Sequence, residues 1–270
     1  MKRLLSLVIL AALLVSATAC GFSRTNDLST PEPTAAAEAA PQQEAVVETP
    51  APEPTPTPEP TPEPLPEPPD VDITDFRFML ANSYNSIGTD YMPPYGGVEG
   101  QGIDSRIIEP MMAFMQAVRD AGFTVYYHAI YRSSDYLLNR YRSALNNYYD
   151  NDPVETAKHM LAPGVNEHQT GLCVDFTDDP QYASYFGEFD DPYMKDTELY
   201  AWLVEHCAEY GFILRYPEGK EAFYGTPCRH AAHFRYVGKE AAAYIMENSL
   251  CLEEFLLLYE GNDVYVPGIT

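Results

Sequence analysis

One short stretch carries a histidine and an aspartate at a spacing that suits a metal site. His168 lies three residues before Gly171, and an alternating apolar segment then leads to Asp175. A histidine at the entrance of a strand and an aspartate inside it can face one point, and glycine lets the backbone turn closely between them. A buried carboxylate requires a strong partner, and zinc accepts both imidazole nitrogen and carboxylate oxygen. With a third protein ligand, one coordination position would remain for water, which is the catalytic arrangement.

The residues around this stretch resemble the Ser-x-His-x-x-Gly-x-Ala-x-Asp motif of VanY-type zinc D-alanyl-D-alanine carboxypeptidases. The sequence Glu-His-Gln-Thr-Gly-Leu-Cys-Val-Asp keeps the histidine, the glycine and the aspartate of that motif. Two further blocks are similar to family blocks in order and spacing: Tyr-Arg-Ser at 131–133 and His-Phe-Arg-Tyr-Val-Gly at 233–238. Three blocks in the family's order are far more specific than one, and they cover most of the region from about 80 to 257.

The resemblance implies a specific set of site residues. His168, Asp175 and His233 fall on the zinc ligands of the family, and Arg132 falls on an arginine that binds and polarises the substrate near the scissile bond. It also implies an α+β fold of the LAS/hedgehog metallopeptidase type, with zinc in a groove over a small, mostly antiparallel sheet. The substrate would be the terminal D-alanine, or a related bond, of peptidoglycan stem peptides.

The last block departs from the family pattern Glu-x-Trp-His, in which the glutamate activates the water. Counting back from His233, the glutamate position holds His230 and the tryptophan position holds Ala232. Neutral imidazole accepts protons near pH 7, so His230 is a candidate general base, although a nearby zinc ion would lower its proton affinity. Three alternatives stay open: His230 acts as the base, it joins the metal site, or the domain binds wall peptides without cutting them.

Several other residues have simpler interpretations. Asn166 replaces the motif serine, and Cys173 replaces the motif alanine, where we expect a small buried side chain rather than a nucleophile. Arg235 lies inside the last expected strand and is interpreted as a structural ion-pair partner. The four cysteines after the export signal allow three pairings or none. They are Cys173, Cys207, Cys228 and Cys251.

Hydrophobic periodicity predicts an irregular alternation of helices and strands. This order indicates an α+β domain with a small, mostly antiparallel sheet. The expected helices cover 104–121, 134–149, 153–160, 199–210, 239–248 and 252–259, and the expected strands cover 123–130, 172–176, 212–215 and 233–237.

The first 70 residues indicate export and tethering rather than catalysis. A basic start, an apolar run over 4–15 and small residues before Cys20 resemble a bacterial lipoprotein signal, which implies cleavage before Cys20 and a lipid on its sulfur. The apolar run is short for a membrane span, and a plain signal peptide is the alternative. Residues 21–70 are rich in Pro, Glu and Thr, which predicts a disordered, extended linker before a domain at 71–270.

The net charge of the chain and its expected export limit the kinds of molecule that it can bind. The net charge is −24, much of it in the linker, which argues against nucleic acid as a partner. We therefore expect an extracytoplasmic protein that is anchored to the bacterial cell membrane through its lipid only, with its domain in the cell wall, peptidoglycan stem peptides as its partner and Zn²⁺ as its cofactor. The competing hypotheses are a wall-binding lipoprotein without catalysis and a purely structural or adhesive surface protein.

Overall fold

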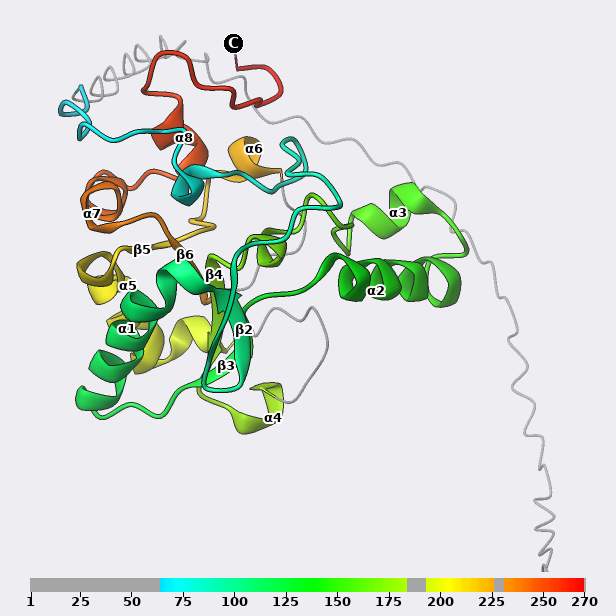
Figure 1. Ribbon diagram of the computed structural model, residues 1–270, viewed down its shortest axis with the longest axis horizontal. Coiled ribbons are helices and arrows are strands. Elements are labelled where there is room, and N and C mark those ends of the chain that lie inside the picture. Colours follow the sequence, from blue (N-terminus) through cyan, green and yellow to red (C-terminus); the bar gives the residue numbers. More distant parts are fainter. Residues whose placement is uncertain (1–63, 184–192, 226–230, 270) are drawn as a thin grey trace, which may run out of the picture. The chain divides into compact units, whose positions relative to one another are not determined.

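The computed structural model describes residues 64–183, 193–225 and 231–269, all within one compact unit, Thr61–Thr270. In these ranges four strands form an antiparallel sheet in the order β3 (Tyr126–Ala129), β4 (Cys173–Thr177), β6 (His233–Tyr236) and β5 (Phe212–Leu214) (Figure 1). A separate hairpin pairs β1 (Tyr95–Val98) with β2 (Gln101–Asp104). The helices are α1 (Ile108–Asp120), α2 (Ser134–Asn147), α3 (Pro153–Ala157), α4 (Pro180–Ala183), α5 (Glu198–His206), α6 (Glu221–Tyr224), α7 (Lys239–Glu247) and α8 (Leu252–Leu256). Short 3₁₀ turns occupy Phe76–Phe78, Ser105–Ile107, Glu167–Thr170, Met194–Asp196 and Cys207–Tyr210.

One face of the sheet forms the larger hydrophobic core. Side chains alternate between the two faces of a strand, so β4, β5 and β6 each turn aromatic or aliphatic residues toward α1. Phe114 of α1 lies at the centre, with ring centroids 5.2 Å from Phe212, 5.7 Å from Phe176 and 6.1 Å from Phe234. Residues of α5 complete this core. The rigid aromatic layer fixes the strands that carry the polar residues of the opposite face.

A second core joins β5 to the two C-terminal helices. Ile213 turns away from α1 and packs with buried residues of α7 and α8, together with Phe78 from the N-terminal 3₁₀ turn. Figure 1 shows α1 and α5 on one side of β5 and β6, and α7 and α8 on the other. The polar side chains of β4 and β6 on the face opposite α1 are buried as well.

The predicted α+β class is confirmed, but the boundaries of several elements differ from those predicted from the sequence. The helix expected from residue 104 begins at Ile108, because Asp104 caps a 3₁₀ turn first by accepting a hydrogen bond from the Arg106 amide. The expected helix 199–210 closes with a tighter 3₁₀ turn after His206. The β1–β2 hairpin was not predicted, because its glycine-rich strands lack an alternating apolar pattern.

The N-terminal part of the described chain lies against the domain. The hydroxyl of Tyr244 donates to the Pro66 carbonyl and that of Tyr259 donates to the Pro69 carbonyl, each at 2.6 Å. Within the described ranges, no helix combines the length and the apolar character needed to cross a lipid bilayer.

The position of Phe114 generates a stability prediction. Phe114→Ala should lower the free energy of unfolding by about 3–5 kcal/mol, because a fully buried ring leaves a cavity among several aromatic neighbours. Urea denaturation followed by circular dichroism measures this change. Met112→Ala on the same helix is the control, since its side chain is 56% exposed, and it should change stability by less than about 0.5 kcal/mol. Equal losses in both variants would contradict the assigned core.

Candidate metal centre

Strand pairing brings the three residues expected to bind metal into one cluster. Asp175 on β4 lies directly opposite His233 on β6, and their Oδ1 and Nδ1 atoms are 2.6 Å apart. His168 reaches the other carboxylate oxygen, with Nε2 3.0 Å from Oδ2 of Asp175. All three side chains are buried. Two imidazoles thus converge on one carboxylate, which is a donor set that suits a zinc ion.

The 3₁₀ turn Glu167–Thr170 places His168 at the entrance of β4. Asn166 caps this turn, its Oδ1 accepting a hydrogen bond from the His168 amide at 3.0 Å. Gly171 ends the turn with φ +69°, and a Cβ atom there would lie 2.8 Å from the Asp104 amide nitrogen. The asparagine that replaces the motif serine therefore still caps the turn, and only glycine fits the following position.

The outer nitrogen of His168 is held by the backbone. Its Nδ1 lies 2.6 Å from the Ile130 carbonyl oxygen at the end of β3. A carbonyl oxygen accepts but does not donate, so Nδ1 carries a proton and the neutral ring presents Nε2 as a lone pair. This arrangement leaves Nε2, the atom that faces Asp175, available as a metal ligand.

The electrostatics of the cluster favour a cation. Burial disfavours the charged form of His168, yet the negative charges of Cys173 and Asp175 outweigh it and raise the pKa of the imidazole to about 9. The pKa of His233 shifts in the same direction, because the same two groups oppose the effect of burial. A buried carboxylate between two imidazoles thus attracts positive charge, which a proton or a metal ion can supply.

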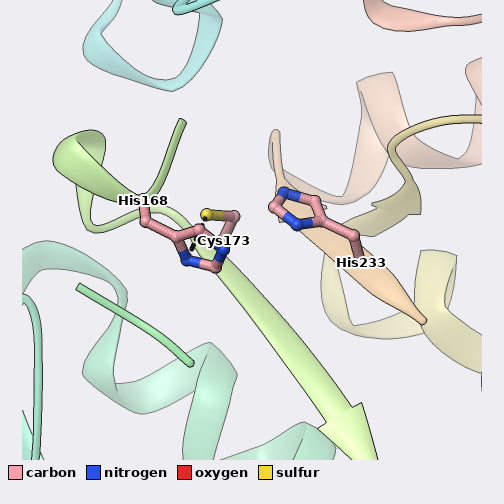
Figure 2. A group of neighbouring side chains, drawn as sticks. All are labelled: His168, Cys173 and His233. Atoms are coloured by element: carbon pink, nitrogen blue, oxygen red, sulfur yellow. Dashed lines mark hydrogen bonds between the residues drawn. The ribbon is translucent and has the colours of Figure 1, made fainter. Parts of the chain in front are cut away.

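Cys173 adds a sulfur atom to the cluster. It lies two residues before Asp175 and so on the same face of β4. Its Sγ is 3.4 Å from Nδ1 of His168, and one ligand atom from each of His168, Cys173 and His233 lies within 4.8 Å of the others (Figure 2). Burial would raise the pKa of this thiol, but the two histidines lower it. Cys173 is buried as expected, and the sequence analysis did not single it out as a metal ligand.

Arg132 lies next to the cluster, at the junction between β3 and α2. Its amide donates to the His168 carbonyl at 3.0 Å, and the next residue, Ser133, caps α2 by accepting from the Tyr136 amide. The half-buried guanidinium acts on His168 through its charge, opposing protonation of the imidazole. His230, the candidate general base, lies outside the described residues, as does Cys20.

The prediction that Arg235 forms a structural ion pair is confirmed, and its partner is a residue that the sequence analysis did not single out. Arg235 Nη1 lies 2.6 Å from Oε1 of Glu167, which is fully buried next to His168. Arg215 also binds Glu167. Burial would raise the pKa of Glu167, but the two guanidinium groups hold it well below its ordinary value. The only signal in the sequence was a charged residue inside an otherwise buried motif.

The described cysteines form no disulfide. Cys173, Cys207 and Cys251 are free and buried, while Cys228 lies outside the described residues. Burial raises the pKa of the Cys207 thiol to about 12, so this group stays protonated and apolar in character. Among these three cysteines, none of the pairings left open by the sequence is formed.

Comparisons with known proteins agree with the site and the fold. The family model of VanY, D-alanyl-D-alanine carboxypeptidase, matches residues 100–239, a range that contains Arg132, His168, Asp175 and His233. A D-alanyl-D-alanine carboxypeptidase of Enterococcus faecalis is 30% identical over 198 residues, which cover 68% of this chain and 67% of the relative.

Solved structures show the same fold. A vancomycin resistance D,D-pentapeptidase VanY mutant, in complex with Zn(II), aligns with a TM-score of 0.55 and 29% identity over 67% of this chain and 99% of that chain. A VanYB complex with D-alanine-D-alanine aligns with a TM-score of 0.55 and 29% identity over 68% and 98%. The expected helix-flanked antiparallel sheet of the metallopeptidase fold is confirmed by these neighbours.

Proposed function

Because this chain belongs to the VanY D-alanyl-D-alanine carboxypeptidase family, we propose that it is a zinc-dependent peptidase that removes the terminal D-alanine of peptidoglycan stem peptides, or cleaves a related bond. The observation that carries the proposal is the convergence of His168, Asp175 and His233 on one buried point. This convergence lies inside the matched range. A solved neighbour is a complex with Zn(II), and another is a complex with D-alanine-D-alanine.

The residues of the cluster fit zinc. His168 Nε2, one oxygen of Asp175 and His233 Nδ1 would hold the ion, and three protein ligands leave a position open. Bound zinc supplies Lewis acidity, which polarises the scissile carbonyl and lowers the pKa of a water molecule. The protein orients the two imidazoles through their other ring nitrogens, His168 Nδ1 and His233 Nε2, which are both hydrogen-bonded. A ring held in this way cannot rotate, so its lone pair stays directed at the metal position.

Arg132 is proposed to bind the substrate beside the metal. Its guanidinium offers a planar fork of donors that matches a terminal carboxylate or a developing oxyanion. The hydrogen bond from the Arg132 backbone amide to the His168 carbonyl holds Arg132 close to a proposed metal ligand. His230 is proposed to move the proton, taking the role of the family's glutamate. The alternative, a peptidoglycan-binding lipoprotein without catalysis, is favoured only by the histidine at this glutamate position.

The purified protein should release D-alanine from a stem pentapeptide, and a chelator should abolish this release until Zn²⁺ is added back. Asp175→Asn should lower kcat/KM by more than about 100-fold, because loss of an inner ligand exceeds the 10- to 100-fold cost typical of outer-shell partners. D-alanine release measures activity, and atomic absorption measures bound zinc. Asp178→Asn, an exposed carboxylate three residues along the chain, is the control and should retain both. Stoichiometric zinc without any release would contradict the proposed reaction.

His230 can be tested separately from the metal. If it is the general base, His230→Ala should lower kcat by about 10²- to 10⁴-fold while zinc content stays the same. A parallel loss of zinc would instead assign His230 to the metal site. His206→Ala, which removes an imidazole paired with Glu209 after α5, is the control. If the wild-type protein has no turnover and His230→Glu creates it, the binding-only alternative is correct.

We also propose that the lipid on Cys20 anchors the protein to the membrane and that the linker of residues 21–70, whose last part lies against the domain at Pro66 and Pro69, holds the catalytic domain in the wall. A polyproline-like linker extends by about 3 Å per residue, so it can hold the domain away from the membrane surface. Cys20→Ser should move the protein from the membrane fraction to the soluble extracellular fraction, without changing its specific activity. Retention in the membrane fraction would contradict lipidation at this residue.

A further inference from the structure

Glu167 divides its two carboxylate oxygens between different partners. Oε1 accepts from Arg215 Nε at 2.7 Å and from Arg235 Nη1 at 2.6 Å. Oε2 lies 2.8 Å from Nε2 of His233. The guanidinium groups therefore occupy one oxygen, and the other faces the imidazole.

This division determines the proton position on His233. With two guanidinium groups on it, the Glu167 carboxylate is ionised and can only accept hydrogen bonds. Nε2 of His233 must then be the donor, and the neutral ring carries its lone pair on Nδ1. That atom is the one that faces Asp175, at 2.6 Å from Oδ1. The geometry thus selects the tautomer that a metal on Nδ1 requires.

The two arginines are themselves fixed from elements outside the sheet. Arg215 binds both oxygens of Glu253 on α8, at 2.9 and 2.6 Å, and Glu253 Oε1 also accepts from the side-chain Nδ2 of Asn82 at 2.6 Å. Arg235 Nη2 donates to the carbonyls of Arg77 and Met79, at 3.0 and 2.7 Å. Two buried guanidinium groups and two buried carboxylates therefore balance in charge, and Glu167 keeps its contacts with Arg235 and His233 independently of Glu253.

We propose that Glu167 is a positioning residue of the metal centre: it fixes the His233 proton on Nε2 and aims Nδ1 at the metal. The inference rests on the zinc binding proposed above. A purely structural ion pair would stabilise the domain without affecting the metal. Glu253 offers the comparison, because it is equally buried and binds the same Arg215 but, in its described contacts, does not reach His233.

Glu167→Gln should lower the affinity for Zn²⁺ by about 10- to 100-fold. The two guanidinium groups would keep the amide oxygen on their side, so the amide NH₂ would face His233 and drive the imidazole proton to Nδ1. Competition with a chromophoric chelator measures the affinity, and thermal denaturation measures stability. Glu253→Gln, the matched control, should lose similar stability but keep its zinc affinity within about threefold.

The outcomes separate this inference from the proposed function. Failure of the wild-type protein to bind Zn²⁺ overturns both, whereas tight binding that is equal in wild type and Glu167→Gln overturns only this inference. Nitrogen-15 NMR of the wild-type imidazoles decides the case even if the variant does not fold. The inference expects His233 protonated at Nε2 and zinc-bound through Nδ1, and the reverse assignment would refute it.

Discussion

The site depends on one buried carboxylate in the middle of the sheet. Asp175 lies on a central strand of the sheet and is only 1% exposed, so water does not solvate its charge. Both of its oxygens instead face imidazole nitrogens, at 2.6 and 3.0 Å. A cation bound there would offset the cost of burying the carboxylate, and the proposed zinc ion would be that cation. The stability of the fold and the proposed reaction would therefore both require positive charge beside Asp175.

Alternation along two strands explains how an aromatic core and a polar centre share one thin sheet. On β4, Val174 and Phe176 face α1 while Cys173 and Asp175 face the metal centre, and β6 alternates in the same way. The aromatic layer around Phe114 holds the strands in register, and the register sets which side chains meet on the other face. A slip of one residue would exchange the core and the site.

His168 and Asp175 could be proposed as metal ligands from one local pattern, in which Gly171 turns the backbone between them, whereas His233 was proposed only from the resemblance to the VanY family. Glu167 could not be assigned in that way, although it lies next to His168, because its partners are 48 and 68 residues further along the chain. The β1–β2 hairpin was not predicted for a different reason, because its glycines interrupt the alternation of apolar and polar side chains that indicates a strand. The local motif thus pointed to part of the cluster, whereas the residues that pack behind it depend on tertiary contacts.

The contacts that hold Arg215 and Arg235 extend beyond the residues that the family model matches. The family match covers residues 100–239. Arg215 donates to Glu253 in α8, which follows that range, and Arg235 donates to the carbonyls of Arg77 and Met79, which precede it. A recombinant fragment trimmed to residues 100–239 would keep every inner ligand and lose these outer contacts. Arg215 and Arg235 would then keep Glu167 as an acceptor but lose the acceptors outside the fragment, which would leave buried positive charge unbalanced. For this protein, we therefore expect the smallest stably folded unit to extend beyond the residues that the family model matches.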